Sequence, residues 1–191
     1  MDAHPALLNP TAADATAPED FTVEFDTTVG PMLIDVNRAW SPHGADRFYN
    51  LVNIGFFTDI IFYRVIEGFM AQCGLHGDPT ITKAWRDAFI PDDPVVEQNI
   101  AGRLSFATSG PGRRTTQIFI NTADNRRLDT MGFSPFGVVR DIEVAKALHA
   151  GYGESTPSGK GPRQGNIHRE GNAMLRRDFP ELDSIKTARI V

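Results

Sequence analysis

The stretch from residue 61 to residue 74 constrains the fold most, because it places an arginine inside an apolar sequence of strand length. Two short apolar runs meet there at Glu67-Gly68. Runs rich in Ile, Val, Phe and Tyr are typical of β-strands, and the glycine between them favours a turn. A hairpin at this place carries Arg64 in its first strand, where a charged side chain needs a structural or functional reason.

Two interpretations of Arg64 follow from the residue pattern. In the first, Arg64 lies at a sheet edge or rim, with its aliphatic stem over apolar surface and its guanidinium in water. In the second, strand alternation brings Arg64 and Gln72 to one concave surface, and Phe69 or Met70 supplies its apolar part. Such a surface suits a peptide amide that is flanked by an apolar ring, because two hydrogen-bonding groups lie beside it.

Alternation of apolar and polar residues predicts an antiparallel, mainly β structure. The alternation begins at Phe21, turns near Gly30 and continues to Val36. Eight strands are expected, at residues 21–26, 32–36, 60–66, 69–74, 102–107, 117–121, 136–140 and 184–190. Helices are expected at residues 41–55, 141–150 and 172–178, with one turn near 83–87 and with Ser41 as the cap of the first. Many short strands with few helices favour a closed or nearly closed barrel.

A second stretch repeats the mixture of apolar and polar residues. Its parts, in order, are Leu104-Ser105-Phe106-Ala107-Thr108-Ser109-Gly110-Pro111, Gln117-Ile118-Phe119-Ile120 and Leu128-Asp129. With the residues around Arg64, in this order and with these gaps, the sequence resembles the cyclophilin family of peptidyl-prolyl cis-trans isomerases over roughly residues 21–148. The resemblance implies a closed eight-stranded antiparallel β-barrel capped by two helices, followed by a C-terminal extension whose terminal strand closes the barrel.

The resemblance also implies an active site for rotation about Xaa-Pro peptide bonds, in the service of protein folding. Arg64 and Gln72 are expected to be catalytic: Arg64 stabilises the twisted amide without a covalent step, and Gln72 orients Arg64. The expected substrate-binding residues are Phe69, Met70, Ala107, Thr108, Gln117, Phe119, Leu128 and Phe133. The expected partners are proline-containing peptides and unfolded or flexible protein segments.

Two departures from the family pattern affect the expected proline pocket. Arg127 stands where many members carry a tryptophan that is tied to strong cyclosporin binding, so weak binding of this drug is predicted. The family histidine before Phe136 is absent from a segment that is one residue longer, and Phe133 is its expected replacement. In addition, Thr108 lies where members often have asparagine.

Two other functions remain open at the level of the sequence. The chain could be a proline-peptide binding module or chaperone with weak or no isomerase activity. It could also be a barrel whose loop at residues 151–165, rich in Gly, Ser and Pro, recruits a partner. A phosphate loop is excluded there, because Gly161 rather than Ser or Thr follows Lys160 and the glycine spacing is one residue too long.

Composition argues against several classes of partner and cofactor. A net charge of -5 disfavours a nucleic-acid partner, which requires a basic surface. The five histidines show no metal-ligand spacing, and neither a metal nor another cofactor is expected. Cys73 is the only cysteine, so no internal disulfide can form and the cytoplasm is favoured. If an export signal has been removed, the protein would instead be periplasmic or secreted.

The chain is expected to form one domain. Residues 1–20 lack the basic start and apolar run of a signal peptide or membrane span. They are expected to be a flexible tail in which Ala6-Leu7-Leu8 docks onto the rest. Residues 21–191 are expected to form a single barrel domain with a loop-rich insertion at about 151–170, present as a monomer with no membrane partner.

Overall fold

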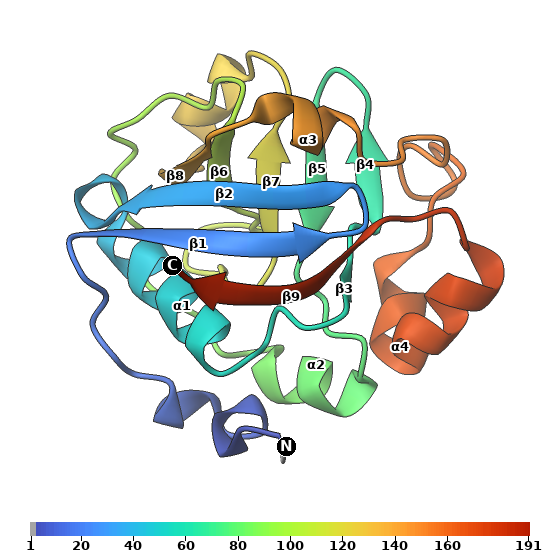
Figure 1. Ribbon diagram of the computed structural model, residues 1–191, viewed down its shortest axis with the longest axis horizontal. Coiled ribbons are helices and arrows are strands. Elements are labelled where there is room, and N and C mark those ends of the chain that lie inside the picture. Colours follow the sequence, from blue (N-terminus) through green and yellow to red (C-terminus); the bar gives the residue numbers. More distant parts are fainter. Residues whose placement is uncertain (1–2) are drawn as a thin grey trace.

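The computed structural model describes residues 3–191, which form one curled antiparallel sheet with helices around it (Figure 1). Within these residues the sheet has nine strands, in the order β3-β9-β1-β2-β8-β6-β7-β5-β4. The strands are β1 (Asp20–Thr27), β2 (Gly30–Asn37), β3 (Ile60–Ile61), β4 (Arg64–Ile66), β5 (Met70–Cys73), β6 (Arg103–Phe106), β7 (Ile118–Asn121), β8 (Pro135–Val139) and β9 (Ser184–Ile190). The sheet curls into a half-barrel, and the expected mainly β, antiparallel architecture is confirmed.

β1 and β2 form the hairpin that the alternation of their residues predicts. Val23 faces Ile34 and Phe25 faces Met32 across the ladder, and all four side chains are buried. The residues between them on each strand are only partly buried. One face of the hairpin therefore packs against the hydrophobic core, while the other face is partly exposed to solvent.

The strand expected at residues 60–66 is divided in two, so the structure has nine strands and not eight. Ile60 and Ile61 form β3 and pair with β9, whereas β4 begins at Arg64 and pairs with β5. Phe62 and Tyr63 between them are buried. β3 and β4 thus stand at opposite ends of the strand order although only two residues separate them along the chain.

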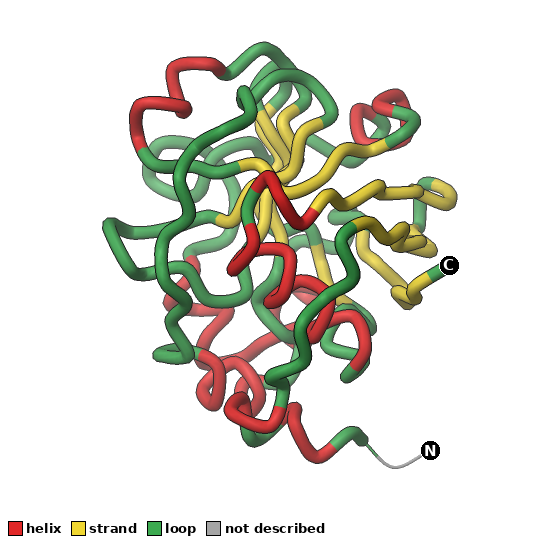
Figure 2. Tube along the Cα trace, turned by 90° about the vertical axis from the view of Figure 1, so that its left-hand side faces the viewer, coloured by secondary structure: helices red, strands yellow, loops and turns green. Residues whose placement is uncertain are grey.

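Helices and short turns fill the space around the sheet. They are α1 (Pro42–Asn53), α2 (Pro79–Trp85), α3 (Ile142–Lys146), α4 (Gln164–Asp178) and the 3-10 turns η1 (Pro5–Leu7), η2 (Pro10–Ala12), η3 (Arg38–Trp40) and η4 (Arg126–Met131). α1 and α3 lie on opposite sides of the long strands in Figure 1, and long loops cross one face of the molecule in Figure 2. Phe48 of α1 packs on Phe25 and Phe136, with ring centroids 5.9 and 5.0 Å away, and joins the helix to the core of the sheet.

Several helix boundaries differ from the expected ones. α2 begins at Pro79, because the Asp78 carboxylate accepts a hydrogen bond of 2.7 Å from the backbone N–H of Thr80 and caps the helix there. α3 ends earlier than expected. α4 begins at Gln164 and is interrupted at Gly171, whose φ of 60° is not helical. The insertion at about 151–170 is therefore a loop followed by helix.

Ser41 occupies the N-cap position of α1 as expected, but its side chain makes no capping hydrogen bond, and the Asp93 carboxylate takes that role. The Asp93 carboxylate accepts hydrogen bonds from the backbone N–H groups of His43 (3.1 Å) and Gly44 (3.0 Å). Ser41 Oγ donates to the same carboxylate at 2.6 Å, and the buried Arg114 pairs with it at 2.9 Å. Burial alone would raise the pKa of Asp93, but these hydrogen bonds hold it below its usual value.

Residues 3–20, the described part of the segment expected to be a flexible tail, contact the helices; residues 1–2 lie outside the described part of the chain. Ala6 and Leu7 are buried, and the Trp85 indole N–H donates to the Leu7 carbonyl at 3.0 Å. Asn50 exchanges two hydrogen bonds with the backbone of Ala15. Of the three residues expected to dock, Ala6 and Leu7 are buried whereas Leu8 is 61% exposed, and the segment is joined to α1 through Asn50 and to α2 through Trp85.

Candidate active site

Arg64 and Gln72 face each other across the short hairpin of β4 and β5. They are partners in the ladder, and the turn between the strands lies at Gly68, whose φ is 69°. Arg64 Nη1 donates a hydrogen bond of 2.8 Å to Gln72 Oε1. The alternation of side chains along the two strands therefore brings the two residues together as the sequence predicts.

A cavity of about 220 Å³ opens beside these two side chains. Nine of the predicted site residues line it, together with one residue that was not predicted: Arg64, Phe69, Met70, Gln72, Ala107, Thr108, Phe119, Leu128, Phe133 and Gln164. Met70, Phe119 and Leu128 form a buried apolar cluster in its wall. The Phe133 ring meets Phe119 edge-on, with centroids 5.6 Å apart and planes at 80°. The cavity is an apolar slot with polar groups along one side.

Gln117 is the predicted site residue that does not line this cavity. It lines an adjoining groove of about 530 Å³, and the groove and the smaller cavity share four lining residues: Gln72, Ala107, Thr108 and Gln164. Gln117 Oε1 accepts hydrogen bonds from Gln72 Nε2, at 3.0 Å, and from the Tyr63 hydroxyl. Gln117 therefore fixes the side-chain amide of Gln72, and Gln72 in turn accepts a hydrogen bond from Arg64.

Glu154 completes the surroundings of Arg64, and no motif or spacing in the sequence predicts this contact. Its two carboxylate oxygens accept hydrogen bonds from Arg64 Nε at 2.7 Å and from Nη2 at 2.6 Å. The hydrogen bond to Glu154 raises the pKa of Arg64 above its usual value, and the same bond lowers the pKa of Glu154. Because the two residues are far apart in the chain and Glu154 lies in a loop, no local periodicity could have revealed the pair.

The two departures at the pocket have clear structural counterparts. The Arg127 guanidinium lies over the face of the Phe69 ring, 4.8 Å from its centroid, in a cation–π contact; Phe69 lines the cavity, whereas Arg127 does not. Phe133, the expected replacement for the absent histidine, lines the cavity. The Thr108 hydroxyl accepts a hydrogen bond of 3.1 Å from the backbone N–H of Gly110 and so takes part in a turn of its own loop.

Other chemistries find little support in the part of the chain that the structure describes. Residues 3–191 hold no group of three or more His, Cys, Asp or Glu side chains that could bind a metal ion. No helix in the same range is long and apolar enough to cross a membrane. Cys73 is fully buried, and burial raises the pKa of its thiol well above the usual value, which disfavours a nucleophilic thiolate.

Fold and cavity together define a half-barrel protein with a partly apolar cavity beside the hydrogen-bond donors of Arg64 and Gln72. Comparison with known proteins identifies the family to which a protein with this fold and cavity belongs. The family model described as cyclophilin type peptidyl-prolyl cis-trans isomerase/CLD matches residues 22–165. The chain therefore belongs to the cyclophilin-type peptidyl-prolyl cis-trans isomerase family.

Individual relatives agree with this assignment. Peptidyl-prolyl cis-trans isomerase A of Dickeya dadantii is 35% identical over 132 residues, which cover 66% of this chain and 70% of that protein. Peptidyl-prolyl cis-trans isomerase ppi1 of Schizosaccharomyces pombe is 35% identical over 135 residues, or 66% of this chain and 83% of its own. A crystal structure of a cyclophilin-type isomerase from Cryptosporidium parvum, in the presence of the dipeptide Ala-Pro, has a TM-score of 0.63 at 20% identity and covers 89% of this chain and 98% of that chain. The last comparison concerns the fold alone.

Proposed function

We propose that this protein accelerates cis-trans rotation about Xaa-Pro peptide bonds by stabilising the twisted amide with Arg64. The observation that carries the proposal is the position of the Arg64 guanidinium at the side of an apolar cavity. Arginine offers five N–H donors, of which Glu154 and Gln72 accept three. Within residues 3–191, one further Nη1–H has only the weak sulfur acceptor of Met70, at 3.9 Å, and one Nη2–H has no protein partner. These last two donors are the ones that a substrate can use.

The chemistry needs no proton transfer and no bond cleavage. Amide resonance sets a rotation barrier of about 18–20 kcal/mol, and that resonance is lost in the twisted state, where the prolyl nitrogen regains its lone pair. A permanently charged guanidinium can donate to this nitrogen or to the neighbouring carbonyl more strongly in the twisted state than in either planar state. The apolar wall of Met70, Phe119 and Leu128 would hold the proline ring and exclude water, which strengthens the hydrogen bond.

The substrates we propose are proline-containing peptides in extended conformation and flexible segments of unfolded proteins. The groove beside the cavity gives such a peptide room to continue past the proline, and it is bordered by apolar, charged and neutral polar side chains: Trp85, Arg86, Asp87, Phe89, Arg113 and His168. We also propose weak cyclosporin binding, because Arg127 stands in place of the family tryptophan and its guanidinium lies over the ring of Phe69, which lines the cavity. The protein would act as a monomer.

The finer description of the fold also belongs to this proposal. We propose that the half-barrel closes as the family barrel does, through the buried pair Phe62-Tyr63 that joins β3 to β4. Support comes from their places at the two ends of the strand order. α1 and α3 would then cover the two open ends of the barrel.

The test is cis-trans exchange of a short Xaa-Pro peptide, measured by NMR with the intact chain and with Arg64→Ala. Arg140→Ala is the matched control, because Arg140 forms an exposed ion pair of 2.8 Å with Asp35 away from the cavity. The proposal predicts acceleration by the intact chain and by the control, and a loss of at least about a hundredfold in Arg64→Ala. Saturable peptide shifts without acceleration by the folded intact chain would contradict the enzyme and favour a proline-peptide binding module.

A further inference from the structure

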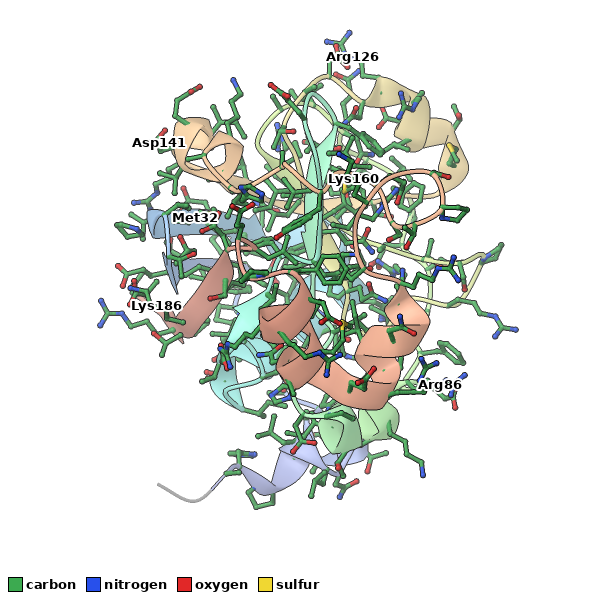
Figure 3. All side chains as sticks on the ribbon, turned by 90° about the vertical axis from the view of Figure 1, so that its right-hand side faces the viewer. Met32, Arg86, Arg126, Asp141, Lys160 and Lys186 are labelled. Carbon is green, nitrogen blue, oxygen red and sulfur yellow. The ribbon has the colours of Figure 1, made fainter. Side chains whose placement is uncertain are left out.

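The loop that carries Glu154 is folded tightly around that residue. A Cβ atom on Gly159 would lie 2.2 Å from the Glu154 carbonyl oxygen, so only glycine fits there. The backbone N–H of Gly161 donates to the same carbonyl at 2.8 Å. Figure 3 shows this segment, marked by Lys160, as a closed loop beside α4. The glycines that suggest a phosphate loop in the sequence therefore serve to fix the Glu154 backbone.

The same loop is attached directly to the strand that carries Arg64. Gly153 forms an antiparallel β-bridge with Val65, the neighbour of Arg64 on β4. The bridge places the next residue, Glu154, beside the arginine side chain. Glu154 Oε1 also accepts a hydrogen bond of 2.7 Å from the backbone N–H of Ser155, which fixes the rotation of the carboxylate.

The insertion approaches the arginine from a second direction through α4. Gln164, at the start of that helix, lines the cavity and accepts a hydrogen bond of 3.2 Å from Gln117 Nε2. Gln117 holds Gln72, which accepts from Arg64 Nη1. The guanidinium is thus held at Nε and Nη2 by Glu154 of the loop. At Nη1 it is held by Gln72, which is hydrogen-bonded through Gln117 to Gln164 of the insertion.

We propose that Glu154 is a positioning residue for the isomerase reaction, and that the function of the insertion at about 151–170 is to place Glu154 beside Arg64. The inference rests on the proposed function of Arg64. Glu154 fixes the plane of the guanidinium so that the two remaining N–H donors point into the cavity, where the twisted amide forms. The loss of this restraint leaves the cation in place but lets it sample orientations that do not reach the substrate.

An ordinary surface ion pair would not justify this proposal, because such pairs contribute little. Three features distinguish this pair: both carboxylate oxygens are engaged, the arginine side chain is only 25% exposed, and the arginine lines the cavity. Glu154 itself does not line the cavity, so it acts through Arg64 and not on the substrate. Its substitution should therefore affect the rate of exchange far more than the binding of the peptide.

The experiment compares Glu154→Gln with the intact chain. Glu24→Gln is the matched control, because Glu24 pairs with Arg189 at 2.8 Å on β1 and is similarly exposed. The exchange rate at saturating Xaa-Pro peptide and the peptide Kd are measured by NMR, together with the Arg64 Nε–Hε resonance. We expect Glu154→Gln to lower the exchange rate about ten- to a hundredfold, with less than a twofold change in Kd. The Arg64 resonance should move towards the position of a free arginine, and the control should change neither quantity.

A double-mutant cycle with Arg64→Lys separates positioning from a merely structural role. Lysine keeps the charge but lacks the fork, so Glu154→Gln should reduce the rate by less than twofold in that background. Equal losses in both backgrounds, or an unchanged or faster rate in Glu154→Gln, would overturn the proposal. If the intact chain does not accelerate exchange, the proposed function fails, but the Arg64 resonance still tests the restraint. An unchanged resonance in Glu154→Gln would then overturn the positioning role by itself.

Discussion

Asp93→Asn should destabilise the protein strongly although it changes a single atom. The wild-type carboxylate is shared by Ser41, two backbone N–H groups at the start of α1 and the Arg114 guanidinium. Both side chains of the Asp93–Arg114 pair are only 2% exposed. The amide cannot accept at both positions and carries no charge, so Arg114 becomes a buried cation without its main counter-ion.

The size of the effect follows from these contacts. Breaking one partner of a buried ion pair costs about 3–5 kcal/mol. Arg114 keeps the Pro91 carbonyl as an acceptor and lies 4.0 Å from the exposed Asp92, which favours the lower end of that range. We therefore expect a loss of about 3 kcal/mol, which for a domain of this size lowers Tm by roughly 6–12 °C.

The assay is urea unfolding followed by circular dichroism, with Asp35→Asn as the control. Asp35 pairs with Arg140 at 2.8 Å, close to the 2.9 Å of the Asp93–Arg114 pair, but its two side chains are 53% and 42% exposed, so its loss should cost less than about 1 kcal/mol. A second variant, Asp93→Asn with Arg114→Met, removes both charges and should recover part of the stability. A loss below about 1 kcal/mol in Asp93→Asn, or no coupling between the two sites, would refute the reasoning.

Three further predictions concern pH, the cavity and the free thiol. The lowered pKa values of Asp93 and Glu154 contribute stability that is fully present at neutral pH and is lost as pH falls below about 4, so urea midpoints should drop steeply in acid and less steeply in Asp93→Asn. Leu128→Ala should cost about 2–3 kcal/mol and raise the Kd for an Xaa-Pro peptide in NMR titration, because it widens the apolar slot; an unchanged Kd would contradict the placement of proline there. Cys73 should react with a thiol reagent only at the rate of unfolding, and fast labelling of the native protein would show that its surroundings open.

The sequence predicted the strands well because their signal is local. The alternation from Phe21 to Val36 identifies the hairpin of β1 and β2 without reference to the rest of the chain. The division of residues 60–66 could not be seen, because all of them except Arg64 are apolar or strand-forming and only the choice of partner strands separates β3 from β4. The count of strands was therefore one too low.

The candidate site was predicted from the order of the family motifs along the chain. Glu154 and Gln164 lie outside those motifs and were not predicted. Residues such as Phe119 and Leu128 would be assigned to the core on residue type alone, and only the family pattern places them at a cavity. Glu154 and Asp93 escaped prediction for a common physical reason: each acts on an element that is distant in the chain, and each lies in a loop without periodicity. Side-chain hydrogen bonds over such separations leave no pattern in the sequence.

The bridge between Gly153 and Val65 has a consequence for the behaviour of the protein at high concentration. β4 is an outer strand of the sheet, and an unpaired outer strand is a template to which a strand of another molecule can add. At Val65 the backbone position that such a strand would occupy is already taken by the loop. The segment that orients the arginine therefore also shields the sheet edge against self-association, and its removal would expose the molecule to intermolecular strand pairing.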